Sequence, residues 1–370
     1  MRRQVAEFIA VGGATFVLFP LAWLFRASVG LDSAELAVGF VAFHGAHFVN
    51  DPHFSVTYLL FYRNVRERAL GGTQSLVQRV RYVVAGLVVP AALVAWAAAA
   101  LVSRSAQTLG WMVQLMFLLV GWHYAKQGFG VLAVLSARRG VRFSPRERTV
   151  ILAHCFAAWA FAWANPASVA GEFEEKGVVY WAPAHPRWLE LTSGSVLALS
   201  TLALVWVLGA KWYRERTLPF TPLVGFLVTI WLWTIFTKLD PLVRYVIPAL
   251  HSIQYLYFVW LMKRNEARAT EGPPTFGRPV GVRLTVLALS ALVLGWVLFH
   301  GAPAIFDDYI VPTWGSSAAN EALGATPFFA AFFVVVNIHH YFMDHVIWRR
   351  ENAETQFLRE VEVDSVVAAA

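Results

Sequence analysis

Apolar residues form long runs along the chain, and short polar stretches separate them. A helix needs about 20 apolar residues to cross the hydrocarbon core of a bilayer, and in a helix the backbone groups bond to one another. The pattern therefore predicts an all-α, polytopic membrane helix bundle with about ten transmembrane helices. The predicted spans are 6–26, 34–60, 82–103, 108–136, 148–166, 189–211, 220–238, 242–262, 283–301 and 326–348.

Basic residues gather in every second loop between these spans, whereas the alternate loops carry acids such as Glu174 and Asp307. Cytoplasmic loops of membrane proteins are enriched in Lys and Arg, so we predict that both termini are cytoplasmic. The basic loop residues are Arg63, Arg66, Arg68, Arg79, Arg81, Arg138, Arg139, Arg142, Arg146, Arg148, Lys211, Arg214, Arg216, Lys263, Arg264, Arg268, Arg278, Arg283, Arg349 and Arg350. The expected location is the cell membrane, specifically a bacterial inner membrane. The expected organisation is one transmembrane domain over 1–350 and a cytoplasmic tail over 351–370.

Composition agrees with this topology, because 58% of the residues are hydrophobic and only 14% are charged. The net charge of +7 does not indicate a nucleic-acid partner, since the basic residues lie in short clusters between apolar runs. Cys155 is the one cysteine, which excludes an internal disulfide and a Cys-rich metal site. Arg2 and Arg3 precede an apolar run that we interpret as a retained first span, not a signal peptide.

Three local features modify the simple pattern. Pro52 lies inside span two, where it removes a backbone donor and predicts a break near Asp51. The segment 167–187, with its prolines and aromatic residues, is expected to lie on the outer membrane surface. The tail after Glu351 is expected to be helical at first and then frayed.

Most of the eleven histidines fall on even-numbered spans, all of which run in the same direction. They can therefore share one depth, as a common site requires. Ionisable groups are costly inside a membrane, so such residues indicate a functional site. These histidines are His44, His47 and His53 on span two, His123 on span four, His251 on span eight, and His339, His340 and His345 on span ten.

Helical spacing assigns faces to these residues. Positions i, i+3 and i+7 share a face, and each step along a helix turns the side chain by about 100°, so His339 points away from His340. The groups that share a face are His44 with His47 and Asp51, His123 with Lys126 and Gln127, His251 with Gln254 and Tyr255, and Asn337 with His340 and Asp344.

This set of residue types suits a metal. Imidazole is a common ligand for Fe, Zn, Cu and Ni, and several histidines with one or two aspartates and no cysteine favour non-haem iron. We expect one iron or a pair, with zinc as the second choice. The candidate ligands are His44, His47, Asp51, His53, His123, His251, His339, His340 and Asp344.

Other polar residues would support the metal ligands. The candidate catalytic residues are Lys126, Gln127, Gln254 and Tyr255. Lys126 is expected to hold an anion or to pair with an aspartate. The side chains expected to orient the imidazoles are Asn50, Asn337, Gln127 and Gln254.

Several polar residues have simpler structural interpretations. We expect His154 to form a hydrogen bond between helices, and His185 and His300 to be solvated or interfacial. For His345 two roles stay open, one at the membrane interface and one in the site. The segment around Asp240, with Arg244, is expected to cap the outer end of span eight.

At the level of motifs, the chain resembles membrane-embedded, histidine-rich non-haem iron enzymes, namely the fatty-acid desaturase and hydroxylase group and the bacterial carotene dioxygenases. The residues that carry the resemblance are His44-Gly45-Ala46-His47 with Asp51 and His53, then His123, His251, and His339-His340 with Asp344. The chain departs from desaturases, whose HxxxH and HxxHH boxes are replaced here by His44-x-x-His47 and an isolated His339-His340. The resemblance implies iron and oxygen chemistry.

We therefore expect an integral-membrane, metal-dependent oxidoreductase: an oxygenase, hydroxylase or desaturase. Its partners would be a lipid or isoprenoid substrate from the bilayer, dioxygen and an electron-donor protein. Two alternatives stay open. One is a metal-free acyl or glycosyl transferase, because His339 and Asp344 have the H-x-x-x-x-D spacing of some acyltransferases. The other is a haem-bearing electron carrier or a proton-coupled transporter.

Overall fold

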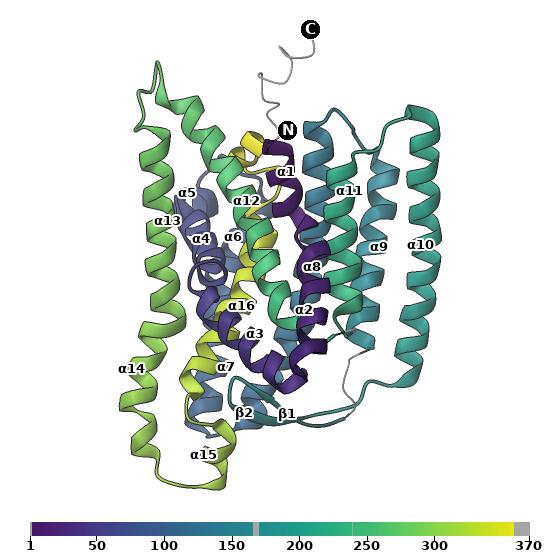
Figure 1. Cartoon of the computed structure of the whole chain (residues 1–370). Coiled ribbons are helices and arrows are strands. Elements are labelled where there is room, and N and C mark those ends of the chain that lie inside the picture. The colour runs from purple at the N-terminus through teal and green to yellow at the C-terminus, as the bar shows by residue number, and fades with distance from the viewer. Residues whose placement is uncertain (1, 166–169, 239, 359–370) are drawn as a thin grey trace.

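The computed structural model describes residues 2–165, 170–238 and 240–358, and most of this chain is helical (Figure 1). The predicted all-α class is therefore confirmed. The main helices are α1 (Arg2–Phe8), α2 (Thr15–Val29), α3 (Leu31–Ala46), α4 (Asn50–Tyr62), α5 (Val65–Leu70), α6 (Leu76–Val83), α7 (Val89–Val102), α8 (Ala106–Arg138), α9 (Pro145–Ala164), α10 (Arg187–Glu215), α11 (Phe220–Leu227), α12 (Val243–Glu271), α13 (Val280–Trp296), α14 (Ala302–Tyr309), α15 (Ala318–Leu323) and α16 (Pro327–Ile347).

Short π-helical or 3₁₀-helical segments join several of these helices. The π-helical segments are η1 (Ile9–Gly13), η2 (Val84–Val88), η3 (Val228–Ile235) and η5 (Val297–Gly301), and the 3₁₀ segments are η4 (Phe236–Lys238), η6 (Val311–Trp314) and η7 (Ala353–Leu358).

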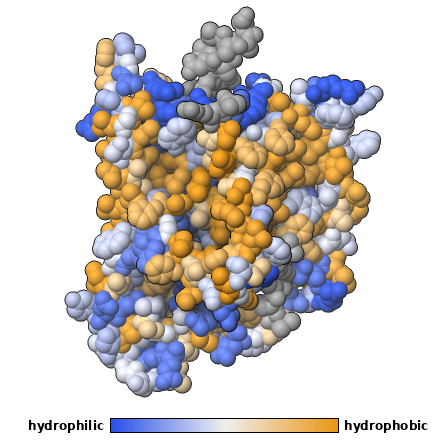
Figure 2. Space-filling view, in the orientation of Figure 1, coloured by the Kyte–Doolittle hydropathy of each residue, from blue (hydrophilic) through white to orange (hydrophobic). Residues whose placement is uncertain are grey.

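In the described part of the chain, four helical stretches are long and apolar enough to cross a bilayer. A fifth is added if the pair Arg3–Gly13 and Thr15–Val29, bent by 55°, counts as one span. Figure 2 shows a largely hydrophobic belt between two hydrophilic ends. The four stretches are Leu76–Val102, Arg187–Glu215, Val280–Trp314 and Pro327–Ile347. The structure is thus compatible with a membrane protein.

Helix α16 lies inside the bundle, not at its edge. In its most apolar stretch 72% of the residues are buried, against 17–22% in the other three spanning stretches. It packs on α4, α7 and α8. Its polar residues therefore face protein, where partners can satisfy them.

The predicted interruption of span two is present, but it precedes the proline. Helix α3 ends at Ala46 and α4 begins at Asn50, so the break covers residues 47–49. Pro52 lies in the first turn of α4, where the missing donor costs no helical hydrogen bond. The break changes the helical phase between His47 and His53.

A β-hairpin that the sequence analysis did not anticipate follows α9. Strands β1 (Gly171–Glu175) and β2 (Val178–Ala182) pair antiparallel. The turn residues Lys176 and Gly177 both have positive φ, 53° and 82°, which suits a tight two-residue hairpin turn. Tyr180 of β2 packs against α8 at Gly110, where a Cβ atom would lie 2.3 Å from the Tyr180 ring.

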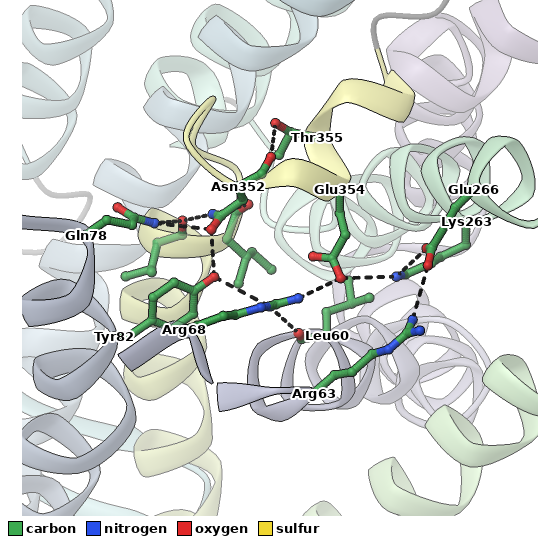
Figure 3. Close-up of polar contacts among 12 residues, drawn as sticks. Leu60, Arg63, Arg68, Gln78, Tyr82, Lys263, Glu266, Asn352, Glu354 and Thr355 are labelled. Carbon is green, nitrogen blue, oxygen red and sulfur yellow. Dashed lines mark hydrogen bonds and ion pairs between the residues drawn. The ribbon is translucent and has the colours of Figure 1, made fainter. Parts of the chain in front are cut away.

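Polar contacts attach the segment after α16 to the neighbouring helices (Figure 3). Arg68 donates to Glu354 at 2.6 Å, and the Tyr82 hydroxyl donates to Asn352 at 2.9 Å. The Asn352 amide donates to the carbonyls of Val346 and Ile347, which end α16. The tail thus begins in a helical turn, η7, as predicted; residues 359–370 lie outside the described part.

The same network contains a buried ion pair. Lys263 donates to Glu266 at 2.7 Å, and Arg63 approaches the same carboxylate at 3.3 Å (Figure 3). Burial opposes ionisation of Glu266, but Lys263, Arg63 and Arg283 outweigh it and lower the pKa of this carboxyl. This end of the bundle, where α12 ends, is therefore held together by charge.

One prediction concerns the contact between α13 and α4. A Cβ atom on Gly295 would lie 2.9 Å from the backbone carbon of Asp51, whereas one on Gly281 of the same helix would meet open space. We expect Gly295→Ala to lower the free energy of unfolding by about 1–3 kcal/mol through overpacking. Thermal unfolding in detergent measures this, with Gly281→Ala as the matched control. Equal stability of the two variants would contradict the close packing.

Candidate metal centre

Four buried imidazoles from four helices meet in the middle of the bundle. His53 comes from α4, His123 from α8, His251 from α12 and His340 from α16. Neighbouring ring centroids lie 4.5 to 5.0 Å apart, in the order His53, His340, His123, His251. No more than 4% of any of these residues is exposed. Four of the five even-numbered spans predicted from the sequence, namely spans two, four, eight and ten, thus bring one histidine each to a common point.

Hydrogen bonds fix the orientation of the His53 ring. The Ser252 hydroxyl donates to Asn50 Oδ1 at 3.0 Å, so its oxygen is left to accept from His53 Nδ1 at 3.2 Å. His53 therefore carries its proton on Nδ1. The lone pair of Nε2 is buried and has no hydrogen-bond partner in the described residues. This is how a neutral histidine is prepared as a metal ligand.

Further imidazole nitrogens in the cluster lack partners as well. His251 Nδ1 and both ring nitrogens of His340 are buried without a hydrogen bond in the described structure. His123 Nε2 and His251 Nε2 lie 3.0 Å apart. Two nitrogens on one metal, each about 2.0–2.1 Å from it, have about this separation. Buried polar atoms without partners are rare, and a bound ion is one explanation.

Asp344 lies beside these rings and is itself held from both sides. Its Oδ2 is 3.4 Å from His123 Nδ1 and 3.6 Å from His340 Nε2. Its Oδ1 accepts from the Tyr255 hydroxyl at 2.7 Å and from Trp348 Nε1 at 3.1 Å. The carboxylate is therefore positioned either to bind a metal or to orient His123.

The residues present fit a transition metal. His53, His123 and His340 each offer one ring nitrogen. These three nitrogens lie within 4.8 Å of one another, as ligands of a single ion must. His251 adds a fourth imidazole and Asp344 a carboxylate. This set of nitrogen and oxygen donors without sulfur suits iron or zinc.

No family model, curated protein or solved structure matches this chain. The centre is therefore interpreted from its own geometry.

A second polar group lies apart from this centre. Asp51 accepts from His300 at 2.9 Å and lies 3.5 Å from His47 Nδ1. The three ligand atoms could also hold an ion. However, none of them is buried without a partner in the described structure, unlike those of the first group. His300, expected to be solvated or interfacial, is here a hydrogen-bond partner of Asp51.

Two further candidate ligands belong to neither group. His44 is exposed and stacks edge-on against Phe40. His339 uses both ring nitrogens elsewhere, accepting from the Tyr58 hydroxyl at 3.0 Å and donating to the Ala85 carbonyl at 2.9 Å. His339 and Asp344, the pair of the acyltransferase spacing, thus contact different partners.

The amides expected near the site form a web beside it. Gln127 donates to Gln254 at 2.7 Å, and Gln254 donates to the Val11 carbonyl at the bend between α1 and α2. Gln127 also lies 3.4 Å from the carbonyl of His251, so this web supports the backbone of α12. Asn337 accepts from Tyr341 and touches none of the four imidazoles.

The remaining histidines lie outside the centre. His154 lies 3.2 Å from the Ser200 hydroxyl, in the bond between helices that the sequence analysis expected. His185 stacks on Trp163, and His345 on Trp122.

Sequence analysis missed two residues that contact the centre. Ser252 belongs to no recognisable motif, and its hydrogen-bond partner His53 is 199 positions away in the sequence. Trp348 was not among the candidate site residues, but it donates to Asp344 four residues earlier. That i, i+4 spacing was the one available signal for Trp348.

Ser252 offers a test of the orienting hydrogen bond. We expect Ser252→Ala to weaken metal binding by about 10- to 100-fold, because His53 Nδ1 loses its acceptor. Competition with a chelator of known affinity measures the change on purified protein.

Ser200→Ala is the matched control, since Ser200 lies at the same distance from His154 Nδ1. Equal metal affinity of the two variants would show that Ser252 does not orient a ligand.

Proposed function

We propose that this chain is an integral-membrane enzyme whose reaction depends on a metal held by His53, His123, His251 and His340. We further propose iron as the metal, and an oxygenase, hydroxylase or desaturase reaction on a lipid or isoprenoid substrate. Dioxygen and an electron-donor protein would be the other partners. The observation that supports a metal most strongly is the set of buried imidazole nitrogens without partners.

The protein residues have separable roles in this proposal. The four imidazoles would hold the metal, which would supply the capacity to activate dioxygen. Ser252 and Asn50 keep the proton of His53 on Nδ1, away from the centre. Tyr255 and Trp348 fix Oδ1 of Asp344, so that Oδ2 faces His123 and His340.

Water exclusion is the second contribution of the chain. The four imidazoles are 0–4% exposed, and Asp344 is 7% exposed. Reactive oxygen species are best formed where water cannot quench them. A buried centre also suits a substrate that arrives from the bilayer and not from solution.

The membrane topology is a further part of this proposal. We propose ten spans with both termini in the cytoplasm of a bacterial cell, because basic residues occupy every second loop. The basic loop between α8 and α9 would then be cytoplasmic, and the β-hairpin would lie outside.

The metal itself is the first test. We expect purified protein to carry about one metal ion per chain, as a preformed binding site requires. His53→Ala and His340→Ala should each lose most of it. Elemental analysis after mild purification measures the content and identifies the metal.

His339→Ala is the control, because His339 is buried in the same helix but bonds to Tyr58 and Ala85. Metal-free wild-type protein, or equal loss in the control, would overturn the proposed centre.

The topology is tested with single cysteines. Arg146 and Glu174 are both exposed, whereas the native Cys155 is fully buried. In intact spheroplasts, a membrane-impermeant maleimide should label Glu174→Cys directly and Arg146→Cys only after permeabilisation. Labelling of both from the same side would contradict the proposed topology.

A further inference from the structure

A large cavity adjoins the metal centre. Its volume is about 760 Å³, which is in the range of sites for small organic molecules. His123, Tyr255 and Asp344 line one part of it. Along α8 its lining extends from Trp122 to Ala137, which is about 20 Å of helix at 1.5 Å per residue. The cavity therefore leads from the metal centre towards the loop between α8 and α9.

The walls of this cavity carry an excess of positive charge. Among the described lining residues, only Asp344 and Glu351 are acids, and Glu351 already lies 3.9 Å from Arg81. Asp344 is held by Tyr255 and Trp348. The lining cations are Lys126, Arg142, Arg148, Arg349 and Arg350.

Among the described residues, no acid forms an ion pair with these cations, although Glu351 attracts Arg349. Arg349 Nε is buried without a hydrogen bond. Lys126 lies over the ring of Phe156, and Arg148 over the ring of Phe129, each at 5.8 Å. Lys126 and Arg349 are partly buried, whereas Arg142, Arg148 and Arg350 are exposed. Partly buried cations without a counter-charge are costly, so an anion in the cavity would stabilise Lys126 and Arg349.

The remaining walls are apolar. They include Val131, Leu132, Val134, Ile151, Phe258 and Leu358. A small inorganic anion would leave this surface uncovered, whereas a molecule with an apolar chain and an anionic group would contact both kinds of wall. Arginine and lysine together favour phosphate, since the guanidinium binds it in two places.

We infer that this cavity binds an amphipathic phosphate, an apolar chain that ends in a phosphate or diphosphate group. Arg349 and Lys126 hold the phosphate, and the chain lies along the apolar wall of α8. This inference rests on the proposed function in one respect: such a ligand is the substrate only if the adjoining centre holds a metal. Binding itself does not require the metal.

Calorimetry on purified, chelator-treated protein tests the inference. The full chain is kept in a maltoside detergent, which carries no phosphate. Three probes are compared: geranyl diphosphate, inorganic diphosphate and geraniol. We expect geranyl diphosphate to bind most tightly, because only it satisfies both the cations and the apolar wall.

Arg349→Gln should weaken the binding of geranyl diphosphate by about 10- to 100-fold, as loss of a charged hydrogen bond predicts. Arg146→Gln is the matched control, since Arg146 is exposed two residues from Arg148 and does not line the cavity. Lys126→Gln replaces Arg349→Gln if the latter does not fold.

The outcomes separate this inference from the proposed function. If inorganic diphosphate bound as tightly as geranyl diphosphate, the inference that the cavity binds an apolar chain would be wrong. If geraniol bound as tightly as geranyl diphosphate, the inference that the cavity binds a phosphate would be wrong. Metal-loaded protein that binds no probe would leave the proposed centre intact and overturn this inference alone. If the protein bound geranyl diphosphate but never carried metal, the inferred ligand of the cavity would be confirmed and the proposed metal-dependent enzyme would be wrong.

Discussion

The structure depends on one constraint: polar atoms buried in an apolar bundle need partners. A buried polar group without a partner costs a few kcal/mol. Most of the buried polar groups in the described residues have a partner. His339 uses both ring nitrogens, and Asp51 is bonded to His300. In the described part of the chain, His154, His185 and His345 each have one unpartnered ring nitrogen at separate places, whereas those of His53, His251 and His340 come together where four helices meet. A bound ion would give these nitrogens partners, whereas Asp51 already has His300 as its partner.

The convergence of these histidines followed from local properties of the sequence. The direction of each span and the period of a helix can be read from the chain, so His123, His251 and His340 were expected at one depth. The turn of about 100° per residue also separated His339 from His340, as the structure shows. The ten-span count itself stays a prediction, because length and composition identify only four or five spans in the described residues.

Other features were not readable because they depend on packing or on a break in periodicity. The grouping of His44, His47 and Asp51 on one face assumed a continuous helix. Residues 47–49 break the helix, so His53 faces the centre while Asp51 faces His300. His47 and Asp51 still meet, at 3.5 Å. The hydroxyl of Ser252 reaches His53 only because α12 lies against α4. The hairpin has strands of five residues, too short to stand out among apolar runs.

The charges around the centre connect the metal and the cavity. A divalent metal at His123 would lie one helical turn from Lys126, in surroundings where like charges interact strongly. Asp344 lies near the rings, and Tyr255 and Trp348 hold it in place. Lys126 and Arg349 line the same cavity and form no ion pair with an acid in the described structure. An anionic ligand would offset the repulsion between these cations and the metal, so occupancy of the cavity should favour occupancy of the centre.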